Sequence, residues 1–249
     1  MQIDPVMWDP RRTLVVAKDE SATIDACGQR LLDLAKEAVR LRDRCVICLS
    51  GGKTPMAFYH AWTQEPLRSQ MPWDKVWLIW GDERPVPPEN ENSNSGNALR
   101  AGLAELPIPA HQIHRMHAEE HIDSNAVHYQ EWLEAHLPDL RIDLLLLGLG
   151  ADGHIASLFP ETEALTETKA LCAANWVPQQ ESWRMTLTFP MLHHAEHTWI
   201  IALGESKADI VADVLTDDRN LYPASHIGSP AHPALWWLDT ASARLLPLR

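Results

Sequence analysis

Three short segments carry the side chains best suited to chemistry, and each of them directly follows an apolar run. They read SGGKTP (50–55), GDERPVP (81–87) and GLGADGHIASLFP (148–160). An unperturbed imidazole titrates close to neutral pH and can take a proton from water, so His154 in the third segment is the candidate general base. We expect Asp152 to project into the same site.

The segment over 50–55 has the composition of a phosphate-binding turn. Gly51 and Gly52 lie between an expected strand and an expected helix, where backbone N–H groups can face an anion at the positive end of the helix. Lys53 adds a positive charge, and Ser50 and Thr54 flank this group. The spacing of a Walker A loop is missing, and a purely structural turn is the alternative for this segment taken alone.

The segment over 81–87 places Asp82, Glu83 and Arg84 immediately after the apolar run KVWLIW. A solvated turn is the simpler interpretation of these charges. Charged side chains at the end of a strand can also orient sugar hydroxyls and hold a catalytic base. Residues 92–95 (NSNS) follow within the stretch 86–96, which we expect to be an ordered loop on the substrate side rather than a domain boundary.

Gly148, Gly150 and Gly153 match GxGxxG, the pattern of dinucleotide-binding loops, so nicotinamide binding is a rival interpretation. Against it, the polar DGH replaces the small residues wanted at the start of the helix, and Pro160 comes too soon for a long helix. The first strand–helix unit of the chain, where this fingerprint usually lies, has no such glycines. We therefore expect these glycines to let the backbone approach a small substrate.

The chain as a whole is acidic, with 21 Lys and Arg residues against 34 Asp and Glu residues and a formal net charge of −13. This charge argues against nucleic acid as a partner, because binding a phosphate backbone needs a basic surface. A small anionic substrate needs cations concentrated at one place. Arg184, which opens RMTLTFP, and Lys207, in GESKA, can supply them together with the amides of SGGKT.

A metal site is not expected. Cys45 and Cys48 form a CxxC, but they lie in an expected strand, where side chains at i and i+3 point to opposite faces. We expect them to be buried core residues without a disulfide. Two groups of histidines, over 111–117 and 193–197, lie away from the glycine-rich loops, and the sequence has no HExxH. We expect these histidines at the surface or at caps.

Short apolar runs alternate with segments of helical spacing along the chain. We expect helices over 19–43, from about residue 55, and over 205–215. Near-continuous apolar strands separated by helices are typical of an open, mostly parallel α/β sheet with helices on both faces. Ligands bind such sheets at the carboxyl ends of the strands, so the three segments should share one edge. The expected strands cover 11–18, 45–50, 75–80, 142–150, 184–189, 197–204 and 234–239.

Length and composition limit the remaining possibilities. The 249 residues, 45% hydrophobic and 22% charged, suit one α/β domain or two small ones, and we expect a single domain over 1–249. No apolar run reaches the roughly 18 residues that span a bilayer. The first residues lack the charged-then-apolar order of a secretory signal. We expect a soluble, cytoplasmic protein with no membrane partner. The sequence leaves the oligomeric state open, and a monomer is the expectation.

Five segments taken together resemble the 6-phosphogluconolactonase family, within the glucosamine-6-phosphate isomerase/6-phosphogluconolactonase superfamily. In chain order they are SGGKTP, GDERPVP with SN after it, LGLGADGHIASLFP, RMTLTFPML and GESKADIV, and GADGHIASLFP is the most specific. The resemblance implies a modified Rossmann-like fold similar to that of glucosamine-6-phosphate deaminases. It also implies hydrolysis of 6-phospho-D-glucono-1,5-lactone to 6-phosphogluconate in the oxidative pentose phosphate pathway. The partner is then a small phosphorylated sugar lactone, with no metal and no cofactor.

Carried over residue by residue, the resemblance implies roles for five positions: His154 as the base, Asp82 and Arg84 in the site, and Arg184 and Lys207 as phosphate ligands. The chain departs from the family pattern at two places. Lys53 stands where Ser or Arg is common, which leaves the number of phosphate contacts open. Glu161 stands where Gly is frequent, which bears on the shape of the loop rather than on its chemistry.

The mechanism that we expect uses water rather than a serine nucleophile, since the sequence has no GxSxG. His154 takes a proton from water, which attacks the lactone carbonyl, and Arg84 is the candidate to stabilise the oxyanion. One rival is an isomerase or deaminase of amino-sugar phosphates. That family resembles DGHIAFNEP where this chain reads DGHIASLFP, so Phe159 takes the place of its catalytic Glu. The other rival is a catalytically silent sugar-phosphate-binding protein, against which Asp152 and His154 argue.

Overall fold

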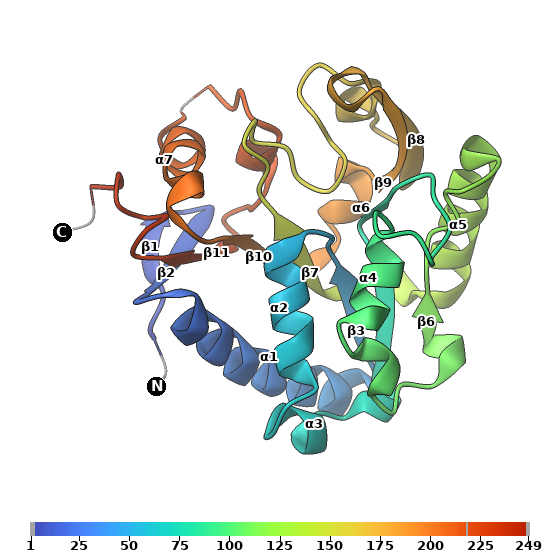
Figure 1. Ribbon diagram of the computed structural model, residues 1–249, viewed down its shortest axis with the longest axis horizontal. Coiled ribbons are helices and arrows are strands. Elements are labelled where there is room, and N and C mark those ends of the chain that lie inside the picture. Colours follow the sequence, from blue (N-terminus) through green and yellow to red (C-terminus); the bar gives the residue numbers. More distant parts are fainter. Residues whose placement is uncertain (1–2, 218, 248–249) are drawn as a thin grey trace.

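An eight-stranded sheet runs through the centre of the molecule, with the strand order β1-β2-β11-β10-β7-β3-β4-β6 (Figure 1). The computed structural model describes residues 3–217 and 219–247. Within them, neighbouring strands of this sheet are parallel except β1 and β2, which are antiparallel. A second sheet has three strands in the order β5-β9-β8. The mostly parallel α/β fold expected from the sequence is confirmed.

The boundaries of the elements follow the alternation seen in the sequence. The strands are β1 (Val6–Asp9), β2 (Arg12–Ala17), β3 (Cys45–Leu49), β4 (Val76–Trp80), β5 (Asp82–Glu83), β6 (Ile113–His114), β7 (Ile142–Gly148), β8 (Cys172–Val177), β9 (Ser182–Leu187), β10 (Ala195–Ala202) and β11 (Ala234–Asp239). The α-helices are α1 (Glu20–Arg42), α2 (Lys53–Trp62), α3 (Leu67–Gln70), α4 (Asn94–Arg100), α5 (Ile122–His136), α6 (Phe189–Leu192) and α7 (Ala208–Thr216). Short 3₁₀ turns lie between them. No helix among the described residues is both long and apolar enough to cross a membrane.

The central strands form the core because they are apolar on both faces. Every residue of β3 and β11 is buried, as are the first six residues of β7. Strands of this kind need cover on two sides, which helices connecting parallel strands provide. The buried side chains between sheet and helices include several large indoles, among them those of Trp62, Trp80, Trp199 and Trp236.

The connections reverse direction between β3 and β7, which lie side by side. The chain advances from β3 to β4 and β6 on one side, then returns through α5 to β7 and continues to β10 and β11 on the other. Right-handed crossovers that advance in opposite directions place their helices on opposite faces. The carboxyl ends of β3 and β7 therefore border a topological switch point, where ligands bind in sheets of this type.

The structure corrects the sequence-based prediction at the strand over 184–189. This segment contributes to β9, which belongs to the small antiparallel sheet and pairs with β5 and β8 rather than with the parallel strands. An apolar run shows that a strand is buried but does not encode its direction or its neighbours. Two helix boundaries also differ from the prediction. The helix expected from about residue 55 begins at Lys53, and the one expected over 205–215 is a 3₁₀ turn followed by α7.

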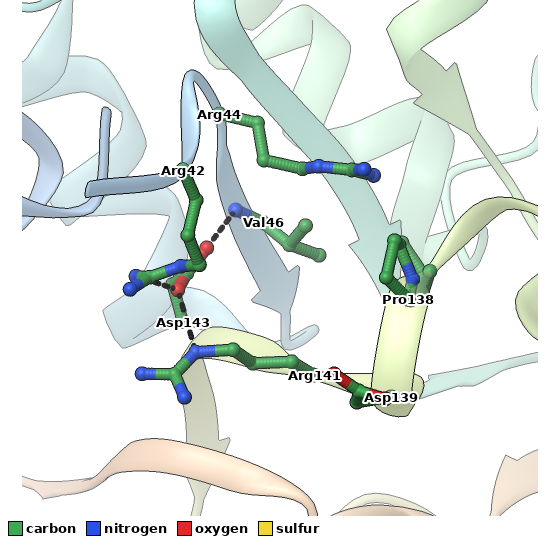
Figure 2. Close-up of a pocket in the computed structure, with 8 residues that line it drawn as sticks. Arg42, Arg44, Val46, Pro138, Asp139, Arg141 and Asp143 are labelled. Atoms are coloured by element: carbon green, nitrogen blue, oxygen red, sulfur yellow. Dashed lines mark hydrogen bonds and ion pairs between the residues drawn. The ribbon is translucent and has the colours of Figure 1, made fainter. Parts of the chain in front are cut away.

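At the amino-terminal edge of β3 and β7, a carboxylate joins the two strands through arginines. Asp143 is almost fully buried and accepts from the backbone N–H of Val46 (2.8 Å). Its other oxygen lies 2.5 Å from the guanidinium of Arg42 and 3.3 Å from that of Arg141. A cavity of about 320 Å³ lies beside this cluster (Figure 2). Arg44 extends in another direction, to the carbonyl of His136, so these arginines hold elements together rather than converge on a ligand.

Removing the Asp143 carboxylate should destabilise the fold. Asp143→Ala leaves the Val46 N–H and two guanidinium groups without their shared acceptor, so we expect the free energy of unfolding to fall by about 3 kcal/mol in urea titrations. Asp33→Ala, at an exposed position of α1, should change it by no more than about 0.5 kcal/mol. Equal losses in the two variants would show that the cluster does not stabilise the β3–β7 pair.

Candidate active site

A cavity of about 490 Å³ lies where the carboxyl ends of β3 and β7 meet. Its lining comes from loops that follow β3, β4, β7 and β10, so the predicted convergence of three polar segments at one edge is confirmed. The residues that line it are Ser50, Gly51, Gly52, Lys53, Thr54, Pro55, Asp82, Arg84, Asn94, Gly148, Leu149, Gly150, Ala151, His154, Ala156, Ile201, Leu203, Ser206 and Lys207.

The turn after β3 presents the start of α2 to this cavity. The buried hydroxyl of Tyr59 fixes the turn, since it accepts from the N–H of Ser50 (2.9 Å) and donates to the carbonyl of the same residue (2.8 Å). Gly52 precedes the helix with φ 104° and supplies no side-chain acceptor for the first-turn N–H groups. Those groups therefore remain available to an anion in the cavity.

Glu83 caps a helix and does not face the cavity. Its buried carboxylate accepts from the backbone N–H groups of Arg84 (2.8 Å), Asn94 (2.6 Å) and Ser95 (2.8 Å), and from the hydroxyl of Ser93 (3.1 Å). A carboxylate at this position satisfies free N–H groups at the start of α4 and complements the helix dipole. The 86–96 stretch, expected to be an ordered loop, is thereby tied to β5, and α4 begins inside it.

Asp82 belongs to the cavity lining and is held from two sides. Its carboxylate accepts from the hydroxyl of Ser157 (2.7 Å), in the loop after β7, and from the side-chain amide of Asn94 (3.1 Å). Asn94 also packs so closely on Gly51 that a Cβ there would lie 1.8 Å from its Oδ1 atom. Asn94 and Asp82 thus join the three loops that surround the cavity.

His154 lies in the cavity wall with its ring oriented by two neighbours. Its Nδ1 atom lies 2.5 Å from Oδ1 of Asp152, and its ring stacks on that of Phe159 with centroids 3.8 Å apart. Burial acts to raise the pKa of Asp152, but the hydrogen bond and charge of His154 outweigh it, so this pKa lies below its ordinary value. An ionised Asp152 accepts a hydrogen bond from the N–H at Nδ1, which leaves Nε2 of His154 as the basic nitrogen.

The glycines of GxGxxG serve close packing around the imidazole. A Cβ on Gly150 would lie 2.0 Å from Nδ1 of His154, and one on Gly153, at φ 77°, would lie 2.5 Å from the ring of Tyr222. After Gly148 the chain continues through a loop and a 3₁₀ turn to β8 rather than into the helix that a dinucleotide-binding loop precedes. Farther along, Glu161 adopts φ 62°, a conformation that favours glycine.

Three cations, Lys53, Arg84 and Lys207, line the cavity, and none of them, nor Arg184 on β9, forms an ion pair with a carboxylate among the described residues. Within the described residues, no Asp or Glu oxygen lies within 4.0 Å of the charged groups of Lys53, Arg84, Arg184 or Lys207. Lys207 donates to the carbonyl of Leu149 (2.6 Å). Burial lowers the pKa of Lys207, and nearby Asp152 offsets part of that effect. In a chain of net charge −13, cations left free of carboxylates in one place indicate a site for an anion.

Two predicted site residues lie outside the cavity lining. Asp152 binds the edge of the His154 ring at Nδ1. Arg184 lies on β9, beside β5, where its guanidinium donates to the hydroxyl of Ser182 (2.7 Å) and the carbonyl of Trp183 (2.9 Å). Burial lowers the pKa of Arg184, and the charge of Arg84 adds to this effect, so the two guanidinium groups are near one another.

Several supporting residues were not identified from the sequence. Asn94 was named only among four polar residues, and nothing in its spacing set it apart. The hydroxyls of Tyr59 and Ser157 bind across the fold to partners that a local pattern does not reveal. Phe159 lies in the SLFP part of the third segment, but no local pattern there predicts that its ring stacks on His154.

The cysteines and histidines behave mostly as expected. All four cysteines are free and buried, which confirms the assignment of Cys45 and Cys48 to the core. His114 differs from the surface position expected, because its ring stacks between Tyr129 (5.1 Å) and Trp132 (3.6 Å). Burial lowers the pKa of His114 to about 4. Among the residues that the structure describes, no three His, Cys, Asp or Glu side chains are grouped closely enough to hold a metal ion.

Known proteins resemble this chain over nearly its whole length. A family model described as glucosamine-6-phosphate isomerases/6-phosphogluconolactonase matches residues 18–237. The 6-phosphogluconolactonase of Chlamydia pneumoniae is 37% identical over 240 residues, which span 95% of this chain and 92% of the relative. A solved structure of a devB protein superposes with a TM-score of 0.86 at 28% identity, covering 94% of this chain and 98% of the other.

The fold alone is shared more widely. A monomeric glucosamine-6-phosphate deaminase superposes with a TM-score of 0.80 and covers 93% of this chain and 99% of its own, at 16% sequence identity. Because so distant a likeness shows only the fold, it confirms the deaminase-like architecture and leaves the chemistry to the residues of the cavity.

The packing of the imidazole on Gly150 can be tested directly. Gly150→Ala introduces a Cβ where Nδ1 of His154 lies, so we expect a crystal structure of this variant to show the ring displaced and its bond to Asp152 broken. Gly148→Ala is the matched control, because its Cβ meets only ordinary contacts at 3.7 Å or more. An undisturbed imidazole in Gly150→Ala would show that the loop has room that the structure does not indicate.

Proposed function

The chain belongs to the glucosamine-6-phosphate isomerase/6-phosphogluconolactonase family, and from this premise we propose that it hydrolyses 6-phospho-D-glucono-1,5-lactone to 6-phosphogluconate. The observation that carries the proposal is the shared cavity, in which His154, oriented by Asp152, lies together with three cations that form no ion pair with a carboxylate among the described residues. The proposed substrate has a neutral ester and a phosphate dianion. The ester needs a general base for its hydrolysis, and the phosphate needs cations to bind it. The 37% identity to a 6-phosphogluconolactonase across the chain supports the same assignment.

The hydrolytic step uses His154 as a general base. Its Nε2 atom takes a proton from water, and the resulting hydroxide attacks the lactone carbonyl carbon. Asp152 keeps the proton on Nδ1 and stabilises the imidazolium that forms, as a carboxylate does in other His-dependent hydrolases. When the tetrahedral intermediate collapses, the ring C–O bond breaks and the imidazolium returns its proton to the departing ring oxygen. The product carries a free hydroxyl and a carboxylic acid, which loses its proton to solvent and becomes the carboxylate.

Cations take two separate parts in this mechanism. Arg84 lines the cavity and donates to the carbonyl of Asn92 (2.6 Å), which leaves other N–H groups of its guanidinium free to stabilise the oxyanion. The phosphate binds to the amides at the start of α2, with Lys53 and Lys207 lining the same cavity. Arg184 joins them by turning from its contacts with Ser182 and Trp183 toward the cavity.

The two rival functions have less support. An isomerase or deaminase of the related type would use a carboxylate where Phe159 stands, and the structure has a buried apolar ring there, stacked on His154. Ammonia release from glucosamine-6-phosphate would favour that rival. A silent sugar-phosphate-binding protein would not need an imidazole with an oriented basic nitrogen. Binding of 6-phosphogluconate with no acceleration of lactone opening would favour it.

The proposal also covers the location, oligomeric state and pathway of the enzyme. We place it in the cytoplasm as a single-domain monomer in the oxidative pentose phosphate pathway. Gel filtration of the active protein tests the oligomeric state independently of the chemistry.

The general base can be tested by its removal. His154→Ala should lower the enzymatic rate of lactone hydrolysis by about 10²–10⁴-fold, because the water then lacks a proton acceptor. The assay couples glucose-6-phosphate dehydrogenase to the lactonase and subtracts spontaneous hydrolysis. His128→Ala, at an exposed position of α5, should keep the full rate. A nearly unchanged rate in His154→Ala would remove this residue from the role.

Phosphate binding by Arg184 can be tested separately from lactone hydrolysis by comparing a phosphorylated with an unphosphorylated lactone. Arg184→Gln removes a charged hydrogen bond to the phosphate, so we expect kcat/KM for the phosphorylated lactone to fall by roughly 10- to 100-fold. The slower hydrolysis of unphosphorylated glucono-1,5-lactone should not change. Equal losses with both substrates would show that Arg184 supports the fold of the site and does not bind phosphate.

A further inference from the structure

One face of the His154 imidazole is covered by an aromatic ring. Phe159 lies with its centroid 3.8 Å from that of the imidazole, and the two planes are inclined by only 21°. The side chain of Phe159 is buried, and it is not part of the cavity lining, whereas His154 is. The phenyl ring therefore lies behind the imidazole, on the side away from the space that a substrate would occupy.

The turn that carries Phe159 is firmly held. The carbonyl of Phe159 accepts from the hydroxyl of Thr162 (2.7 Å), and that hydroxyl in turn accepts from the side-chain amide of Asn175 (3.1 Å). Asn175 is buried in β8 and also donates to the carbonyl of Ser157 (2.9 Å). The small antiparallel sheet thus fixes the position of Phe159, and through it the position of the ring in front.

An aromatic face interacts differently with the two protonation states of a histidine. The centre of a phenyl ring carries partial negative charge and attracts a cation placed over it within about 6 Å. A neutral imidazole gains little from this field, whereas an imidazolium gains more. If His154 takes a proton as the lactone is attacked, the interaction strengthens on the way to the transition state, which is the condition for it to accelerate the reaction.

We propose that Phe159 is a positioning residue for the general base: its ring fixes the plane of the His154 imidazole and stabilises the imidazolium formed as water is deprotonated. The inference rests on the proposed function of His154 and adds a second group that acts through it. Asp152 orients the ring by its edge, at Nδ1, and Phe159 supports it by its face. Nε2 is the atom left to meet water in the cavity.

Other ionisable groups surround the imidazole, and a test of Phe159 must leave all of them unsubstituted. They are Asp152 on the same loop, Lys207 at the start of α7, Lys53 at the start of α2, Asp82 and Arg84 from β5 and the turn after it, and the phenol of Tyr222 beyond Gly153. Substitutions at Phe159 change none of these groups. A change in the pH dependence can therefore be attributed to the ring.

The test compares Phe159→Leu with a trifluorinated phenylalanine at the same position. Leucine keeps the apolar character of the site but has no aromatic face, whereas the fluorinated ring keeps the shape and loses most of the negative charge at its centre. For both, we expect kcat to fall by about 3- to 30-fold with KM little changed. The acid limb of the pH profile should move down by roughly half a unit to one unit, because the imidazolium is less favoured.

The direction of the pH shift separates this role from simple packing. Water that entered beside a smaller leucine would favour the charged ring and move the acid limb upward. An upward shift, or a fluorinated variant that behaves like the parent enzyme, would overturn the proposal. Phe189→Leu is the matched control, since Phe189 also stacks on a histidine, His193 (5.7 Å), outside the cavity lining, and should leave the profile unchanged.

An NMR titration of the imidazole at position 154 tests the stack without reference to turnover. The signal is assigned by its absence in His154→Ala, and it should titrate at lower pH in both Phe159 variants. If the parent protein fails to hydrolyse the lactone, the proposed function is wrong, and the titration still reports on the interaction. If it hydrolyses the lactone and the titration is unchanged in the variants, the role of Phe159 is wrong.

Discussion

The geometry of the site depends on β3 and β7 being parallel neighbours from which the chain leaves in opposite directions. Their carboxyl ends border the same opening, so the turn beginning at Ser50 and the loop containing His154 face one cavity. Asp143 fastens the opposite ends of the two strands, where the ladder itself has few paired residues. The turn proposed to bind phosphate and the proposed proton acceptor, separated by about a hundred residues in sequence, become neighbours through this one strand pair.

Buried polar contacts set the finer arrangement around that opening. Glu83 ties the start of α4 to β5, and Asn94 at that start reaches both Asp82 and the turn at Gly51. The small antiparallel sheet supports the loop after β7 from behind, through Asn175. His154 is held at its edge by Asp152 and at its face by Phe159, in a cavity that Lys53, Arg84 and Lys207 also line. Such preorganisation lets charge develop during a reaction without rearrangement of the protein.

The sequence was sufficient for the central features and insufficient for those that depend on distant partners. Apolar runs separated by helical segments predicted the parallel sheet, and the rule that strand ends share an edge predicted the cavity. The segment containing Arg184 was assigned to the wrong sheet, because the apolar pattern of a strand carries no information about its direction. Glu83 could not be recognised as a helix cap, since α4 was not predicted. Gly150 was seen as one of three glycines, and only coordinates show the imidazole that excludes a side chain there.

A crystal structure of the complex with 6-phosphogluconate would test the central claim most directly, namely that one small molecule meets the base and the cations together. We expect the new carboxylate within about 3 Å of Nε2 of His154, with the phosphate on the amides that begin α2 and on at least one of the neighbouring cations. A phosphate bound against His154, or a ligand seated outside this cavity, would contradict it.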